Sequence, residues 1–319
     1  MAFHSVRDYV LLLTLSLIWG GSFAVIKIAV ATVTPLTIAA GRIAIAFILL
    51  YALARAAGEV LPALRDAAGR ASWGHFLAVG MLGNGIPFTL VSWGEIEVSA
   101  SLAAILIGVM PVFTVVFAHL TAIERIDGPR RLIGVGAGLA GLVVLMGPAA
   151  LGRLGGEAVL AQLAVAGAAA SYAATAVYAR RLTLRMPTLT LAAGTMGASA
   201  AVMVPAALLV DAPWRLAPSA GAVASVAALG VFATALASIV YFRLLASAGP
   251  TFSSMINYLI PAFGAVIGVA WLGEAVGPRE LVALALILGA IALVRNPMTR
   301  GPAGRPGRPD DRKNRVAGE

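Results

Sequence analysis

The sequence predicts an all-α membrane protein with ten transmembrane helices, arranged as a 5+5 inverted repeat with both termini in the cytoplasm. Three observations predict this fold class: the composition, an internal repeat and a bias in the basic residues. Of the 319 residues, 60% are hydrophobic and only 12% are charged, and the hydrophobic residues form long runs. Soluble domains carry about twice that share of charge, so a polytopic membrane protein is expected.

The apolar runs are long enough to cross the hydrocarbon core, which takes about 20 helical residues. Backbone groups must be satisfied inside lipid, so these runs are expected to be helices rather than open strands. The absence of cysteine excludes disulfides and thiolate chemistry. The ten predicted spans are 9–31, 36–54, 73–93, 99–119, 131–148, 158–179, 188–209, 220–245, 251–272 and 278–295.

The chain repeats itself. LIGVMPVFTVVFAHLTAIE at 106–124 and INYLIPAFGAVIGVAWLGE at 256–274 share a proline and a glutamate at an offset of 150. TPLTIAAGR at 34–42 faces PTLTLAAGT at 187–195 at an offset of 153. A regular offset of this kind indicates duplicated units. We therefore divide the chain into a first repeat (1–150), a second repeat (151–295) and a basic tail (296–319) whose composition predicts disorder.

The basic residues indicate how the repeats are oriented. With the N-terminus inside, 18 of the 23 basic residues fall on inner segments and 4 on outer segments, and Arg42 lies within a span. This bias is typical of membrane topology, so the net charge of +9 does not indicate a nucleic-acid partner. Because each repeat has an odd number of spans, the second must cross the membrane in the opposite sense. Inverted repeats are typical of secondary transporters.

At this point the sequence resembles a family. LIWGGSFAVIK at 17–27, the prolines of spans 4 and 9 and the GPR-containing turns after them are similar to the drug/metabolite transporter superfamily, in its EamA-type branch. Within it, the chain is most similar to the YddG-type amino-acid exporters. The resemblance implies a multi-pass protein of the bacterial inner membrane that exports small amphipathic metabolites, amino acids first among them, by alternating access. It implies neither a cofactor nor an obligatory oligomer, and a monomer suffices.

The placement of the carboxylates bears on energy coupling. The aspartates are expected in loops or tails, and the glutamates at span ends, in loops or at the terminus. Ion-coupled carriers usually place a carboxylate within the membrane, so we expect transport without a buried-carboxylate proton relay. A proton-coupled drug or metabolite efflux carrier is the alternative, with His119 as its titratable group. An intramembrane lipid-modifying enzyme is the alternative of another class, but no acid, base or metal cluster indicates one. A non-transporting scaffold would leave the repeat unexplained.

A central binding site should be mostly apolar with a few polar anchors, at the midplane between the repeats. Aromatic residues at matched positions, such as Trp19 and Tyr172, can stack on an amphipathic substrate. Helix packing is the other interpretation of each aromatic, and interhelical hydrogen bonding that of each asparagine. The candidate substrate-binding residues are Trp19, Ser22, Asn84, Phe88, Ser92, Met110, Tyr172, Thr175, Tyr178, Tyr241, Ser254, Asn257 and Tyr258.

Arg42 is the charged residue expected inside a span, about 10 Å from its outer end. A buried cation needs a partner. We expect Arg42 to pair with Glu95 or Glu97 and brace an outer gate. The alternative is that Arg42 binds a substrate carboxylate.

Pro111 and Pro261 occupy matched places in the two repeats. Proline inside a helix removes a hydrogen bond and breaks or kinks the helix. Because the repeats face opposite ways, the two prolines are expected to act as hinges at similar depths from opposite sides. A kinked helix without a hinge is the other interpretation.

Overall fold

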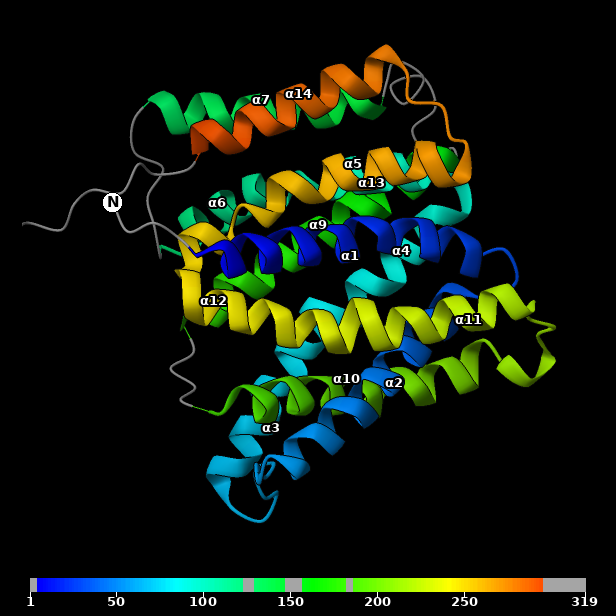
Figure 1. Ribbon diagram of the computed structural model, residues 1–319, viewed down its shortest axis with the longest axis vertical. Coiled ribbons are helices and arrows are strands. Elements are labelled where there is room, and N and C mark those ends of the chain that lie inside the picture. The colour runs from blue at the N-terminus through cyan, green and yellow to red at the C-terminus, as the bar shows by residue number, and fades with distance from the viewer. Residues whose placement is uncertain (1–4, 123–128, 147–156, 182–185, 295–319) are drawn as a thin grey trace, which may run out of the picture.

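The computed structural model describes residues 5–122, 129–146, 157–181 and 186–294. The predicted tail and Glu124 therefore lie outside the described residues. All regular elements within these ranges are helical, and the helices lie roughly along one direction (Figure 1). We call the end at which α1 begins and α14 ends the N-terminal end, on the left in Figure 1, and the opposite end the far end.

Each predicted span coincides with a helix or with a chain of consecutive helices. Seven such stretches are long and apolar enough to cross a membrane, and Leu132–Leu145 and Ile256–Leu272 are shorter apolar helices. The first repeat contains α1 (Val6–Ala29), α2 (Pro35–Ala56), α3 (Ala67–Gly80), η1 (Met81–Gly85), α4 (Ile86–Glu97), α5 (Ala100–Ile107), α6 (Met110–Leu120) and α7 (Pro129–Met146). The second contains α9 (Glu157–Arg181), α10 (Thr188–Val210), η2 (Pro213–Arg215), α11 (Ala220–Ala228), η3 (Leu229–Leu236), α12 (Ala237–Ser253), α13 (Ile256–Leu272) and α14 (Pro278–Val294).

Matched helices of the two repeats pack against each other. Helix α2 packs on α10, α5 on α13 and α7 on α14. In Figure 1, α2 and α10 run in opposite directions, and so do α7 and α14. Helix α1 packs on α11 and α12 of the second repeat, and α4 packs on α9. The repeats are therefore interleaved rather than placed side by side.

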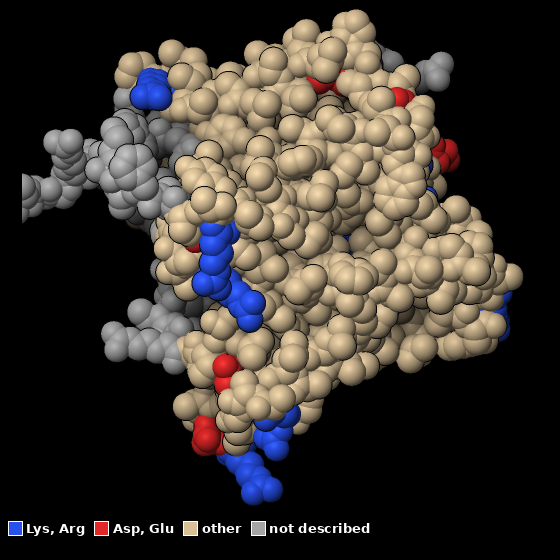
Figure 2. Space-filling model, viewed as in Figure 1, with Lys and Arg blue, Asp and Glu red and all other residues tan. Residues whose placement is uncertain are grey.

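Charged side chains gather at the two ends of the molecule. Figure 2 shows them near the left and right ends of this face, with a broad band of other residues between. Many large apolar side chains of the long helices are exposed, including Ile48, Val143 and Val266. An exposed apolar band with charged ends is the surface that a lipid bilayer requires.

A reciprocal pair of carboxylates ties the repeats together. Asp211 accepts from the Thr37 backbone N–H (2.9 Å) and hydroxyl (2.8 Å) in the first turn of α2, and from the Thr34 hydroxyl. Glu59 accepts from the Thr190 N–H (2.7 Å) and hydroxyl (2.9 Å) in the first turn of α10. Thr37 and Thr190 are repeat mates at the offset of 153. We call these contacts the Asp211 clamp, at the far end, and the Glu59 clamp, at the N-terminal end. Both place an anion at a helix N-terminus, where it is stabilising.

Spans 4 and 9 differ, contrary to the expectation of matched breaks. Span 4 is interrupted at Gly108 and Val109, and Pro111 lies in the first turn of α6. Pro261 instead lies inside the continuous helix α13. The predicted start of span 9 at residue 251 is also wrong, because the chain kinks at Gly249 (φ 78°) and α13 begins only at Ile256. Span 9 is interrupted at residues 254 and 255, which correspond to 104 and 105 at the offset of 150. This break therefore comes about one helical turn earlier than the break of span 4 at 108 and 109.

Helix α13 approaches its neighbours closely through glycine. A Cβ at Gly108 would lie 2.8 Å from Pro261 Cγ, and one at Gly264 would lie 2.3 Å from the Ala104 Cβ. A Cβ at Gly20 of α1 would lie 2.8 Å from the Phe263 Cβ. Small residues allow such backbone approach and drive helix association in lipid. The ring of Pro261 thus packs at the break of span 4.

Candidate functional site

Two π-helical stretches lie at matched places in the middle of spans 3 and 8. They are η1 in the first repeat and η3 in the second, and an offset of 150 relates Asn84 of η1 to Thr234 of η3. A π-helical turn departs from the i to i−4 hydrogen-bond ladder, and such turns are frequent at functional sites. In each repeat the π-helical stretch packs against helices of the other repeat: η1 against α9 and α10, and η3 against α1 and α2.

Each π-helical stretch receives a hydrogen bond from the other repeat. The Trp19 indole N–H of α1 donates to the Ala233 carbonyl of η3 at 3.1 Å. The Ser171 hydroxyl of α9 donates to the Leu82 carbonyl of η1 at 2.7 Å. Trp19 also lies against Tyr241, with ring centroids 5.8 Å apart. The first helix of each repeat therefore holds the π-helical stretch of the other.

Arg42 lies beside η3. Its side chain is 3% exposed, its Nε donates to the Thr234 hydroxyl at 3.1 Å, and its Cζ lies 3.7 Å from the centroid of the Phe88 ring. A guanidinium stacked on an aromatic face gains a cation–π interaction, which is strongest where water is excluded. We call Arg42, Phe88 and Thr234 the Arg42 site. Tyr172 of α9 packs against the apolar cluster that contains Phe88.

The predicted ion pair between Arg42 and Glu95 or Glu97 is not formed. Across the described residues, no salt bridge joins Arg42 to either glutamate. Glu95 lies seven residues beyond Phe88 on α4, which is about 10 Å along the helix. Glu97 is exposed at the last position of α4. The guanidinium therefore sits too deep in the helix bundle to reach the end of α4.

Glu95 is enclosed instead. Its side chain is 0% exposed, and neither carboxylate oxygen has a hydrogen-bond partner in the part of the chain that the structure describes. The Ser92 hydroxyl, one turn earlier on the same face of α4, is also fully buried and without a partner. The carboxylate was expected at a span end, and it does lie near the end of α4, but inside the protein. The expectation of transport without a buried-carboxylate proton relay therefore loses its basis, because Glu95 is a buried carboxylate.

Two other charged residues hold the helix ends next to Glu95 at the far end of the molecule. The Lys27 ammonium donates to the backbone carbonyls of Glu95 (2.6 Å) and Val98 (2.9 Å), where α4 ends. Glu274 accepts from the Ala100 N–H (2.7 Å), and from the Ser101 N–H (2.8 Å) and hydroxyl (2.6 Å), where α5 begins. A cation at a helix C-terminus and an anion at a helix N-terminus are both favourable. Glu274 therefore braces the start of α5 from the second repeat.

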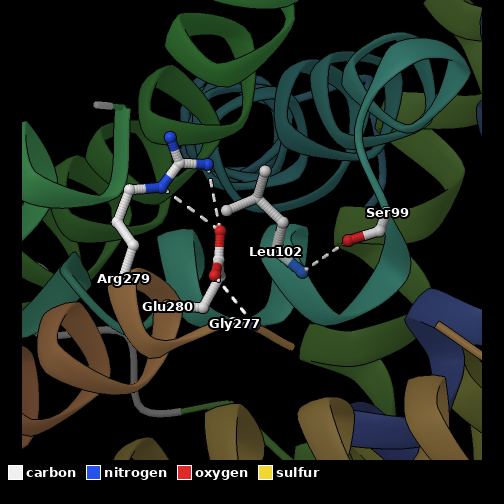
Figure 3. A network of polar contacts seen from close by, with 5 residues as sticks. All are labelled: Ser99, Leu102, Gly277, Arg279 and Glu280. Atoms are coloured by element: carbon white, nitrogen blue, oxygen red, sulfur yellow. Dashed lines mark hydrogen bonds and ion pairs between the residues drawn. The ribbon is translucent and has the colours of Figure 1, made fainter. Parts of the chain in front are cut away.

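The neighbouring turn is held in a similar way (Figure 3). Glu280, in the first turn of α14, accepts from the Gly277 N–H at 2.9 Å and from Arg279 Nη2 at 3.0 Å. Ser99 caps α5 by accepting from the Leu102 N–H at 3.2 Å. Both are N-cap contacts that satisfy free backbone donors. They fix the helix starts on either side of Glu274.

The remaining predicted residues have different surroundings. Ser22 bonds to the Trp19 carbonyl and Thr175 to the Ser171 carbonyl, both within their own helix. Tyr178 bonds to His75 Nδ1 at 2.8 Å, which joins α9 to α3 away from the Arg42 site. The half-buried residues near the helix breaks are Met110 at the start of α6, Ser254 between α12 and α13, and Asn257 and Tyr258 in the first turn of α13. Asn84 is half-buried in η1.

Sequence reasoning did not select Thr234, Ser171 or Lys27. The repeat offered one signal, because the offset of 150 pairs Thr234 with Asn84, which was a candidate. Nothing in the sequence pattern distinguishes Ser171 from other small polar residues of a span. Within the described residues, no group of three or more His, Asp or Glu side chains could hold a metal ion.

Comparisons with known proteins agree with this architecture. The model of the EamA-like transporter family matches residues 7–147 and 159–296. The uncharacterized inner membrane transporter YedA of Escherichia coli K12 is 30% identical over 286 residues, covering 89% of each chain. A probable terminal-alkyne amino-acid exporter of Streptantibioticus cattleyicolor is 28% identical over 299 residues, covering 91% of this chain and 94% of that protein.

Two further comparisons extend this picture. The S-adenosylmethionine/S-adenosylhomocysteine transporter of Chlamydia trachomatis serovar L2 is 25% identical over 299 residues, covering 89% of this chain and 88% of that protein. One solved crystal structure is similar in fold, with a TM-score of 0.63 and 24% identity, covering 90% of this chain and 97% of its own. The two family matches account for both repeats and indicate a duplication. This multi-pass membrane protein, a transporter rather than an enzyme, belongs to the EamA-like transporter family.

Proposed function

We propose that the protein exports amino acids and similar small amphipathic metabolites across the bacterial inner membrane by alternating access. The ten helical segments would be ten membrane spans, with the second repeat inverted and the N-terminal end in the cytoplasm. Arg7 at the start of α1, Arg55 at the end of α2 and Arg130 at the start of α7 all lie at that end. Lys27, Arg215 and Arg279 lie at the far end. This distribution supports the inner placement of the N-terminal end.

The Arg42 site carries the proposal on substrate. Its guanidinium is enclosed and stacked on Phe88, and among the described residues it bonds only through Nε, to Thr234, so its terminal nitrogens are available to a ligand. A planar guanidinium binds carboxylates in a bidentate manner. The absence of the predicted brace to Glu95 favours the alternative that Arg42 receives a substrate carboxylate. The aromatic rings of Trp19, Tyr172 and Tyr241 would line the apolar part of the site.

The named relatives support the same substrate class. One is called a probable amino-acid exporter, and another an S-adenosylmethionine transporter. Both kinds of molecule carry an α-amino acid group with a free carboxylate. A carboxylate anchor at the centre of the repeats would serve either one.

The test is counterflow in proteoliposomes preloaded with unlabelled solute. Amino acids should exchange, whereas their amides and methyl esters, which lack the carboxylate, should exchange at least tenfold less well. Arg42→Lys, which keeps the charge but loses the planar fork, should raise the half-saturation concentration about tenfold for carboxylate substrates. Arg55→Lys is the control, because Arg55 is exposed on the same helix.

Two outcomes would contradict the proposal. Equal exchange of acids and amides would remove Arg42 as a carboxylate anchor. No exchange of any solute, from a folded and reconstituted protein, would favour a scaffold that does not transport.

A further inference from the structure

Glu95 is a buried acid that the proposed exchange of substrate does not use. It lies two residues before the last residue of α4, is 0% exposed, and among the described residues has no hydrogen-bond partner on either carboxylate oxygen. Buried acids in proteins are normally paired or hydrogen-bonded. An enclosed carboxyl without either of these compensations indicates that it binds a proton or another small cation.

The surrounding face of α4 is polar and equally incomplete. Phe88, Ser92 and Glu95 recur at four- and three-residue spacing, so they lie on one face of the helix. The Ser92 hydroxyl is the second group on this face that is fully buried without a partner. Phe88 carries the stacked guanidinium of Arg42. The substrate anchor and Glu95 therefore share a helix face, about 10 Å apart along its axis.

The charges that face Glu95 are engaged elsewhere. Lys27 of α1, Arg42 of α2 and Glu274 beside α5 interact with it electrostatically. The Lys27 ammonium is bound to backbone carbonyls, Arg42 to Thr234, and Glu274 to the first N–H groups of α5. Helix α9 meets this end of α4 at Gly94 with the uncharged residues Ala161 and Val165. Of the described side chains, none forms an ion pair with Glu95.

These observations indicate the protonation state of the Glu95 carboxyl. An ionised carboxylate removed from water costs several kcal/mol unless direct hydrogen bonds or an ion pair compensate it. One bound proton removes that cost, whereas a metal ion would need several oxygen ligands around it. We propose that Glu95 is a proton-binding site, and that its protonation and deprotonation couple transport to the transmembrane proton gradient.

The coupling follows from the contacts that close the far end. Glu274 of the second repeat holds the start of α5 in the first repeat, directly after the helix that carries Glu95. Opening the far end separates these contacts and admits water to Glu95. From that side the Glu95 carboxylate takes up one proton as the substrate leaves. Once the far end has closed, the carboxyl gives its O–H proton to cytoplasmic water as the next substrate binds. Each cycle thus moves one proton against the direction of the substrate.

The test separates coupling from exchange. In proteoliposomes with wild-type protein, a gradient of one pH unit should drive accumulation of substrate up to tenfold, the limit for one proton per substrate. Glu95→Gln, which mimics the protonated form, should retain counterflow but lose this accumulation. Glu97→Gln is the matched control, because Glu97 is exposed two residues away and should leave both activities unchanged.

The outcomes are distinct from those of the proposed function. Wild-type counterflow without any response to the pH gradient overturns the proton site and leaves the proposed function standing. Accumulation that follows a sodium gradient and is lost in Glu95→Gln would assign a sodium site instead, which also overturns it. If Glu95→Gln does not fold, substrate is added to wild-type protein in weak buffer instead. Release of a proton supports the proposal, and no release overturns it.

Discussion

The two repeats share their supporting contacts but not their charges. The Asp211 and Glu59 clamps hold matched threonines, and both repeats carry a π-helical stretch bonded by the first helix of the other. By contrast, Arg42 is matched by Thr195, and at the offset of 150 Glu95 is matched by Leu245. Symmetric contacts thus build the frame, while the buried charges of one repeat supply the site. The frame and the site can be tested separately.

Packing at the matched positions illustrates the difference. A Cβ at Gly230 of η3 would lie 3.2 Å from the Arg42 carbonyl, and one at Gly80 would lie 2.4 Å from the Thr195 carbonyl. The backbone contact is therefore the same on both sides. The side chains diverge: Arg42 reaches across to Thr234 and Phe88, whereas the Thr195 hydroxyl bonds to carbonyls of its own helix.

The largest effect on stability is expected from Lys27, a charge of the first repeat. Lys27→Met leaves the carbonyls at the end of α4 without their donor, and we expect a loss of about 2–3 kcal/mol in the free energy of unfolding. Denaturant unfolding in detergent measures it. Lys27→Arg, which keeps a cation at the helix end, should recover most of the loss. Equal stability of Lys27→Met and wild type would show that the contact contributes nothing.

The clamps should have intermediate and equal effects. Asp211→Asn and Glu59→Gln each weaken charge-assisted bonds to a helix start, at about 1–2 kcal/mol. Because the clamps lie at opposite ends, the two variants should favour opposite access states. Labelling of single cysteines introduced at each end, in a chain that has none, reads this out. A shift toward the same side in both variants would break the symmetry argument.

A smaller effect is expected at the threonines. Thr234→Val removes the partner of Arg42 Nε and should cost about 1 kcal/mol. Thr195→Val removes only bonds within its own helix and should lower the free energy of unfolding by only about a few tenths of a kcal/mol. Thermal unfolding of the two variants, compared with wild type, measures the difference. Equal losses would show that Thr234 does not support the Arg42 site.

The smallest stability effects are expected at the prolines. Pro111 occupies the first turn of α6, where a missing N–H is harmless, so Pro111→Ala should be nearly neutral. Pro261 interrupts the hydrogen bonds of α13, so Pro261→Ala should straighten that helix and shift the access state further. The hinge roles of both prolines stay predictions. Cysteine labelling that changes more in Pro111→Ala than in Pro261→Ala would contradict this order.

The place of nearly every membrane span could be predicted from the sequence. Helix positions follow from runs of apolar residues, and the predicted limits of span 7 (188–209) lie within one residue of α10. Span 9 is the exception, because a left-handed glycine and a kink leave no mark on hydropathy. His119, the predicted proton relay of the alternative function, lies exposed in the last turn of α6.

The features of the Arg42 site also divide into those that the sequence indicated and those that only the structure revealed. Composition and spacing selected Arg42, Phe88, Trp19 and Tyr241, because charged and aromatic residues inside apolar runs are visible in one dimension. The sequence by itself therefore determined the helices, the duplication and the residue types of the site. Only the tertiary structure decided that Arg42 turns to Thr234 and that Glu95 is left without a partner. Rotation about each helix axis and the crossing of the two repeats set those contacts, and neither is encoded in a local pattern.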